Sequence, residues 1–348
     1  MKQRNHFLDI AKGVAVLLVI ITHFSWEESE RLRYLFPFWV SMAVPIFMIV
    51  FGYANAASFE KKNIQTLHRA YAPDLLLRKF ARFTVPFAIA YVFNIIFHSI
   101  LEEKLSLRAI IVYFFRGGVG EKGTYYYPVL LQLIFLFPVL YFIIKRYENG
   151  LLLCFIMNVV YELLARICMV NGKCYRLLSF RYLFLIAFGC YLYEYKGNKL
   201  KNKNWILFLS GIGFIIATDY LGYEPLTVTY WERTCVYAVL FFLPLFSFAM
   251  AHGKNLRCRF LEMLGQASYH VFFVQMLYYN YWENRVGTWM PNRACHLLVN
   301  ILICVSVGIA YYYFETPVSR YVMKKLENVP VSEFRLYKAL FLKKSRQF

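Results

Sequence analysis

Apolar blocks of about twenty residues recur along the whole chain of 348 residues. A block of that length, wound as a helix, crosses a hydrocarbon core about 30 Å thick. Hydrophobic residues make up 60% of the chain and charged residues only 17%, whereas about a quarter of a soluble domain is charged. We therefore expect an all-α integral membrane protein that forms one domain without a soluble appendage.

Ten membrane-spanning helices are expected. The segments are 7–26, 37–57, 80–101, 126–144, 150–170, 180–195, 204–221, 234–251, 264–282 and 296–314. With both termini inside, the inner segments hold roughly twice as many lysines and arginines as the outer ones, as the positive-inside rule requires. The outer segment with Arg166, Lys173, Arg176 and Arg181 is the exception, because it is as basic as an inner loop.

The net charge of +19 has an explanation in this topology. Most of the positive charge lies where anionic lipid headgroups attract it, so we expect membrane lipid as a partner and no nucleic acid. Residues 1–328 are predicted to form the transmembrane domain and 329–348 a basic cytoplasmic tail. This tail is partly amphipathic, which favours a position on the inner membrane surface.

The sequence has no pattern typical of a resident metal or cofactor. Its eight cysteines form no CxxC, and no His/Cys cluster has the spacing of a metal site. The stretch "GGVGEKG" at 117–123 lacks the spacing of a phosphate-binding loop, and we interpret it as a flexible turn. No permanently bound cofactor is expected.

Three ionisable residues lie on the first apolar helix, "DIAKGVAVLLVIITHF" at 9–24. Lys12 and His23 differ by about 20° around the helix axis and are about 16 Å apart along it. Asp9 adjoins Lys12 on the same face. Taken singly, Lys12 could reach the inner headgroups with Asp9 as its partner, and His23 could be an interfacial histidine. Their shared face indicates instead a polar stripe directed into the protein, because such groups are costly in lipid.

A second group is basic. Within "LLRKFARFTVPF" at 76–87, Arg78, Lys79 and Arg82 stand where the third span leaves the cytoplasm. Lys79 and Arg82 share a face and could grip a polyanion together, since arginine makes forked phosphate contacts. Ordinary positive-inside charge is the alternative.

The third feature is Glu315 in "YYYFETPVSRY" at 311–321, at the inner end of the tenth span. Pro317 follows it and is predicted to close the helix or to begin another. The Glu315 carboxylate could pair with Lys12, Lys79 or Arg82.

These stretches together resemble the membrane acyltransferase-3 family, multi-span O-acyltransferases that modify bacterial surface and secreted polymers. "DIAKGVAVLLVIITH" is similar to the opening segment of the family, whose basic residue and histidine fall here on Lys12 and His23. The family's basic-x-x-Arg pair falls on Lys79 and Arg82. "FRYLFLIAFGCYL", "LEMLGQASYHVFFVQ" and "YYYFETP" resemble its later blocks in the same order.

Two positions depart from the family pattern. The second-span block "WVSMAVPIFMIVFGYA" has Phe51-Gly52 where the family usually has Ser-Gly. The ninth-span block often ends in histidine, and this chain has Gln275. Glutamine can form hydrogen bonds, but it cannot titrate.

The resemblance implies a function and a role for each residue. It implies transfer of an acyl group, acetyl in our expectation, from acyl-CoA to a hydroxyl of a cell-surface or secreted polysaccharide or its lipid-linked precursor. The cytoplasmic membrane of a bacterium would be the location. The implied roles are general base or acyl carrier for His23, charge stabilisation near the thioester for Lys12 with Asp9 or Glu315, and binding of the donor phosphates for Arg78, Lys79 and Arg82.

Two other classes remain open from the sequence. In a transporter or flippase, the polar stripe would line a substrate path and catalyse nothing. In a polysaccharide assembly complex, the chain would be a non-catalytic membrane subunit.

Overall fold

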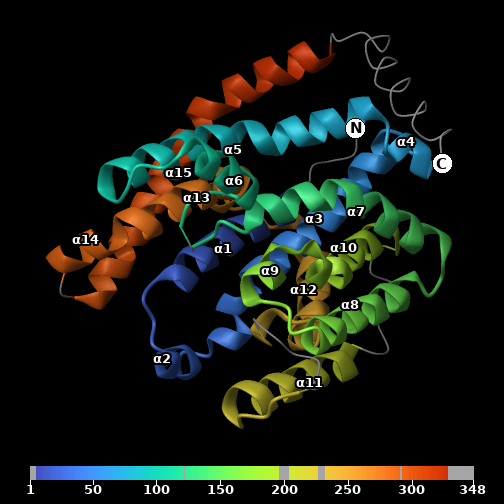
Figure 1. The fold of residues 1–348 in the computed structure, drawn as a ribbon. Helices are drawn as coiled ribbons and strands as arrows, with labels where there is room; N and C mark the ends of the chain where they lie inside the picture. The colour runs from blue at the N-terminus through green and yellow to red at the C-terminus, as the bar shows by residue number, and fades with distance from the viewer. Residues whose placement is uncertain (1–4, 121, 196–203, 226–231, 291, 328–348) are drawn as a thin grey trace.

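The computed structural model describes residues 5–120, 122–195, 204–225, 232–290 and 292–327. These residues form helices and connecting turns, and no β-strand occurs among them (Figure 1). The all-α fold class is therefore confirmed. Figure 1 shows α5 and α15 along one edge of the bundle and α11 along the opposite edge, with α1, α3, α7, α10 and α13 between them.

A helix overlaps each of the ten segments predicted to cross the membrane. These helices are α1 (His6–His23), α3 (Ala43–Lys61), α5 (Pro73–Leu101), α7 (Tyr126–Arg146), α8 (Gly150–Ile167), α10 (Leu183–Tyr195), α11 (Asn204–Ile215), α12 (Phe242–His252), α13 (Arg259–Tyr281) and α15 (Arg293–Glu327). Shorter helices lie in the connections: α2 (Glu28–Arg33), α4 (Leu67–Ala70), α6 (Leu107–Arg116), α9 (Gly172–Leu177) and α14 (Glu283–Trp289).

Six stretches of the described chain are long and apolar enough to cross a membrane. They are His6–His23, Phe36–Lys61, Pro73–Leu101, Tyr126–Arg146, Gly150–Ile167 and Arg293–Glu327. Helices α10, α11 and α12 are shorter, and α13 has the length but is more polar. The number of ten spans and the inside location of both termini stay predictions, and the tail predicted at 329–348 lies outside the described residues.

Two helix ends differ from the sequence prediction. The last helix neither closes nor restarts at Pro317, because α15 continues through this residue to Glu327. A proline inside a helix removes one backbone donor and crowds one turn, which a long helix tolerates. Helix α5 begins at Pro73, seven residues before the predicted start, and a proline is well suited to the first turn of a helix.

Two contacts define one end of the bundle, which we call the His6 end. His6 Nδ1 lies 2.6 Å from Glu262 Oε2 and joins the start of α1 to the start of α13. Arg78 Nη1 lies 3.7 Å from Glu327 Oε1 and joins the first turns of α5 to the end of α15.

The opposite end, where α1 finishes, is called the His23 end. Arg293, at the start of α15, donates to both carboxylate oxygens of Glu30 at 2.7 and 2.9 Å. It also donates to the carbonyl of Ser25 at 2.7 Å. The backbone N–H of Glu27, and after it Arg293, lower the pKa of the Glu30 carboxyl. The short helix α2 is thereby tied to the last helix of the bundle.

Helices α1 and α13 pack with their backbones almost in contact. A Cβ placed on Gly265 of α13 would lie 1.8 Å from the carbonyl oxygen of Asp9, and one placed on Gly13 of α1 would lie 2.3 Å from the carbonyl oxygen of Leu261. Small residues permit such close approach between helices in a membrane. This contact sets the register of α1 against α13.

We predict that Gly265→Ala lowers the melting temperature in detergent. The added methyl cannot fit beside the Asp9 carbonyl, so α1 and α13 must separate, and overpacking of this kind costs about 1–3 kcal/mol. Gly213→Ala is the matched control, because a Cβ on that helical glycine meets nothing within 4 Å. Equal melting temperatures for the two variants would contradict this account of the packing.

Candidate functional site

Both ends of the polar stripe of α1 lie beside α13. The carbonyl of Asp9 lies beside Gly265, and its carboxylate is 2.8 Å from the Lys12 ammonium. At the other end of α1, the His23 ring lies against Tyr279 of α13 with the ring centroids 6.1 Å apart. The predicted inward direction of the stripe agrees with this arrangement.

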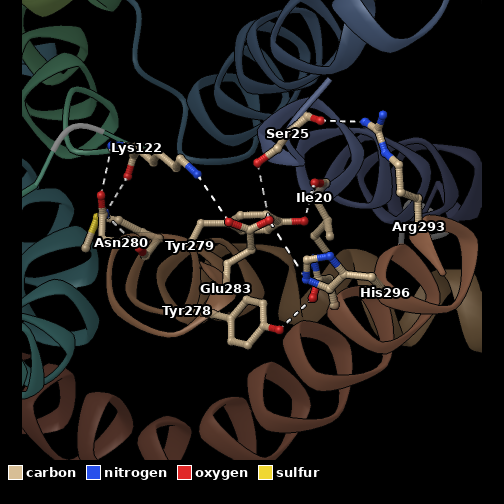
Figure 2. Close-up of polar contacts among 11 residues, drawn as sticks. Ile20, Ser25, Lys122, Tyr278, Tyr279, Asn280, Glu283, Arg293 and His296 are labelled. Atoms are coloured by element: carbon tan, nitrogen blue, oxygen red, sulfur yellow. Dashed lines mark hydrogen bonds and ion pairs between the residues drawn. The ribbon is translucent and has the colours of Figure 1, made fainter. Parts of the chain in front are cut away.

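Tyr279 links His23 to the neighbouring polar groups. Its hydroxyl donates to the carbonyl of Ile20 at 2.9 Å, one turn before His23 (Figure 2). The ammonium of Lys122 lies 5.2 Å from the centroid of the Tyr279 ring. Lys122 and Arg31 are the charged residues that act electrostatically on His23. The ring nitrogens of His23 form no hydrogen bond within the described part of the chain.

A buried carboxylate lies next to this group. Glu283 is 2% exposed, and its Oε2 is 3.8 Å from the Lys122 ammonium. Its Oε1 accepts from the Ser25 hydroxyl at 3.4 Å and lies 3.9 Å from Nε2 of His296 (Figure 2). A buried carboxylate needs such partners, because an isolated charge is strongly penalised in an apolar interior.

The loop that carries Lys122 is held firmly against α13. The backbone N–H of Lys122 donates to the Asn280 side chain at 3.2 Å, and that side chain donates to the Lys122 carbonyl at 3.1 Å (Figure 2). Gly120 has a positive φ of 107°, and a Cβ there would lie 2.6 Å from Asn280. The segment forms a turn, as predicted, and its described residues dock on α13; its flexibility stays a prediction.

Sequence reasoning missed Lys122, Tyr279, Glu283 and His296 as members of this site. Tyr279 and Glu283 lie four residues apart, a spacing that places them on one helical face. Aromatic residues surround them in the sequence, and such a cluster is also typical of a membrane–water interface, so the pattern alone does not mark a site. Lys122 and His296 had no local signal, because only tertiary folding brings their segments to α1.

Glu315 has a partner other than those predicted. Its Oε2 is 2.8 Å from Nε2 of His270, and the hydroxyl of Ser319 donates to Oε1. The sequence prediction named Lys12, Lys79 or Arg82 as possible partners of Glu315. Helix α13 packs against α15, however, and its His270 forms the contact with Glu315 instead. Both residues of the pair are buried, and His270 stands halfway along α13.

At the His6 end, Lys79 points into an aromatic pair. Its ammonium lies 4.5 Å from the centroid of the Phe59 ring and 5.1 Å from that of Phe137. Cation–π attraction of this kind holds an ammonium group in place. Arg82, on the same face of α5, is exposed.

Three further cations gather near Lys79. Arg78 makes the long ion pair to Glu327 and keeps its Nε buried without a hydrogen bond in the described structure. Partial burial, and then the charges of Arg78 and Arg82, lower the pKa of the Lys62 ammonium, whereas Asp74 raises it. Lys62, which follows α3, thus belongs to the same basic cluster, and sequence reasoning had not included it.

The predicted site residues therefore fall into separate places. Asp9 pairs with Lys12, and Arg78, Lys79 and Arg82 gather with Lys62 at the His6 end, whereas His23 lies at the opposite end. Lys12 and His23 are about 16 Å apart along α1, so they cannot contact the same carbonyl group. Among the described residues, no group of three His, Cys, Asp or Glu side chains is placed to hold a metal ion.

The family model for an acyltransferase domain matches residues 5–315. The chain belongs to the acyltransferase-3 family. Comparison with curated proteins and with solved structures found no match. The match supports acyltransferase activity, and together with the long apolar helices it indicates a membrane protein.

The match includes each of the residues predicted for the site, from Asp9 to Glu315. An acyltransferase needs a group that removes a proton from the acceptor and groups that hold the donor. The His23 end offers an imidazole with unoccupied nitrogens, and the His6 end offers clustered cations. This acyltransferase also has a buried polar pair, His270 and Glu315, between these two ends.

We expect the buried pair of His270 and Glu315 to be energetically coupled. In a double-mutant cycle of His270→Phe and Glu315→Gln, followed by unfolding in mixed micelles, the coupling energy should be about 0.5–3 kcal/mol. The control cycle joins His270→Phe with Glu283→Gln. Glu283 lies beyond the end of α13, at the start of α14, and its described partners, Lys122, Ser25 and His296, do not include His270 or Glu315, so the two effects should add within about 0.5 kcal/mol. Additivity in both cycles would show that the contact contributes nothing.

Proposed function

We propose that the protein is a membrane O-acyltransferase that moves an acyl group, acetyl in this proposal, from acyl-CoA to a hydroxyl of a cell-surface or secreted polysaccharide or its lipid-linked precursor. The observation that carries the proposal is the environment of His23. Its imidazole lies beside Tyr279 at the end of a polar helix face, and its nitrogens form no hydrogen bond with other described residues. A ring nitrogen is thereby available to an acceptor hydroxyl.

His23 acts as the general base in this mechanism. An imidazole nitrogen takes the proton of the acceptor hydroxyl while the hydroxyl oxygen attacks the thioester carbonyl carbon. The carbon–sulfur bond then breaks, and the imidazolium returns its proton to the leaving thiolate. Histidine suits this exchange because its ring nitrogens can both accept and donate a proton, and positioned proton transfer contributes about 10²–10⁴-fold in rate.

Lys122 is placed to assist at the same end. Its ammonium lies near Tyr279 and within 3.8 Å of the Glu283 carboxylate. A fixed positive charge stabilises the negative charge that develops on the carbonyl oxygen during attack. Glu283 in turn restrains the ammonium, so the charge needs little rearrangement during the reaction.

The donor enters from the His6 end. Coenzyme A carries phosphates, and Lys62, Arg78, Lys79 and Arg82 supply positive charges there. The thioester must then reach His23 at the other end of α1. Lys12, held by Asp9, lies closer to the His6 end than His23 does, and in this proposal it contacts the donor on the side of its phosphates.

His23 variants test the catalytic proposal most directly. His23→Ala should lower acyl transfer by about 10²-fold or more, the effect of losing a general base. His23→Gln should be equally impaired, because glutamine forms hydrogen bonds without accepting a proton. The measurement is transfer from acetyl-CoA to a polysaccharide acceptor by purified protein in nanodiscs.

His252→Gln is the control for this experiment, because that histidine is exposed at the end of α12. It should keep the wild-type rate. If His23→Gln retains most of its turnover, the general-base role is wrong and His23 lines a substrate path, as in a transporter.

The basic cluster should govern donor affinity. We expect Arg82→Gln to raise the half-saturating acetyl-CoA concentration about tenfold, because a hydrogen bond to a charged group contributes about 1.5–3 kcal/mol. Lys79→Gln should act in the same direction, but it also removes the contacts with Phe59 and Phe137. Arg82→Gln is therefore the cleaner variant.

Arg146→Gln provides the matched control for donor binding. This arginine ends α7, whose other end lies beside the Lys122 loop, and it is exposed. Its replacement should leave the donor dependence unchanged. If Arg82→Gln and wild type have the same half-saturating acetyl-CoA concentration, the basic cluster does not bind the donor and is ordinary positive charge at a membrane surface.

A further inference from the structure

The carboxylates of the α2 segment are already engaged. Glu27 accepts a hydrogen bond from the backbone N–H of Glu30 in a capping box. Glu28 pairs with Arg233, and Glu30 pairs with Arg293. Each of these three carboxylates therefore has a partner outside the arginines of α2. Arg31 and Arg33 form no ion pair with them in the described structure.

Arg31 follows Glu30 on α2, and side-chain contacts bring this helix to the site. Arg293 joins Glu30 to the carbonyl of Ser25, and the hydroxyl of Ser25 donates to Glu283.

The Nε of Arg31 is buried and has no hydrogen-bond partner in the described structure, and the charge of Arg31 acts on His23. Arg33, two residues later on the same helix, is exposed to solvent. A buried guanidinium N–H without an acceptor is costly, so this group indicates a missing negatively charged partner.

Lys122 adds a second positive charge beside His23, and Glu283 adds one negative charge. Glu283 is also shared with Ser25 and His296. With a neutral imidazole, the group of Arg31, Lys122 and Glu283 therefore has a net charge of +1. A site with a positive charge next to its base favours an anionic ligand.

We infer that the acceptor carries a negative charge, a carboxylate or a phosphate, close to the hydroxyl that receives the acyl group, and that Arg31 and Lys122 bind this charge. This inference rests on the proposed function, since it concerns the acceptor of the same reaction. The guanidinium of Arg31 matches the two oxygens of either group. Lys122 then neutralises the charge from the side of Tyr279 and presents the neighbouring hydroxyl to His23.

The structure thereby narrows the class of acceptor. A neutral glycan would leave the buried Nε of Arg31 without an acceptor after binding, and that unsatisfied donor would lower the affinity of the glycan. A uronic acid residue or a glycosyl phosphate supplies a negatively charged oxygen that accepts a hydrogen bond from Arg31. These two sources share the same chemistry at the site, and the size of the anion separates them experimentally.

The test compares three acceptors with purified protein in nanodiscs and acetyl-CoA. They are an oligosaccharide of glucuronic acid, the corresponding oligosaccharide of glucose, and glucose 1-phosphate. Wild type should use an anionic acceptor at least about tenfold better in kcat/KM than the neutral one. Preference for the glucuronate or for the phosphate identifies the source of the charge.

Arg31→Gln should remove this preference by raising KM for the anionic acceptor about tenfold, the loss expected for a charged hydrogen bond. The ratio of kcat/KM for the glucuronic acid oligosaccharide to that for the glucose oligosaccharide should therefore fall toward one. Arg33→Gln is the matched control, because it removes the same charge from the same short helix but from an exposed position. Equal effects of the two variants, or equal use of neutral and anionic acceptors by wild type, would overturn the inference.

Binding is measured separately from transfer, by the shift of the melting temperature that each acceptor produces without acetyl-CoA. The anionic acceptors should stabilise wild type and Arg33→Gln but not Arg31→Gln. Selective binding without any transfer would refute the proposed function and leave the anion site standing. Acyl transfer without charge-selective binding would refute the anion site and leave the proposed function standing.

Discussion

The close contact between α1 and α13 determines the geometry of the molecule. Gly13 and Gly265 lie against the carbonyls of Leu261 and Asp9, and no side chain fits between these backbones. In a membrane, helices associate through close packing rather than through a hydrophobic driving force. Because both helices are rigid, this contact near the His6 end also fixes His23 against Tyr279 at the other end.

The packing of the helices also decides which polar side chains in the bundle become partners. Ionisable side chains within apolar helices are costly unless they meet partners. Asp9 meets Lys12, His270 meets Glu315, and Glu283 meets Lys122. Near the His23 end, several described nitrogens lack hydrogen bonds, among them those of the His23 imidazole and the Nε of Arg31, with Nε2 of His296 beside them. Paired groups stabilise the fold, and in our proposals the His23 and Arg31 nitrogens serve a ligand.

The two ends of α1 have different chemical characters. Cations collect at the His6 end, and Lys79 is held there by Phe59 and Phe137. At the His23 end, a histidine, a lysine and a carboxylate share one small region. Acyl-CoA, the donor in our proposal, suits this separation. Its phosphates and its thioester are joined by a long chain, so the phosphates can lie at the His6 end while the thioester reaches toward His23.

Much of the fold was predictable because the membrane imposes helix length and apolar composition on the sequence. A helix overlaps each of the ten predicted segments, and the shared face of Asp9, Lys12 and His23 follows from helical geometry alone. Helix ends were less predictable. Pro317 interrupts neither the apolar pattern nor α15, because a long helix tolerates the loss of one backbone hydrogen bond.

The sequence by itself determined the all-α class, the candidate residues of α1 and α5, and the resemblance that the family match confirmed. These features reside in local patterns of charge and periodicity. Only the tertiary structure decided that Glu315 pairs with His270, that the glycine loop brings Lys122 to His23, and that α2 leaves Arg31 beside the site. Such pairings join residues that are distant in the chain, and they depend on which helices pack together and at what depth.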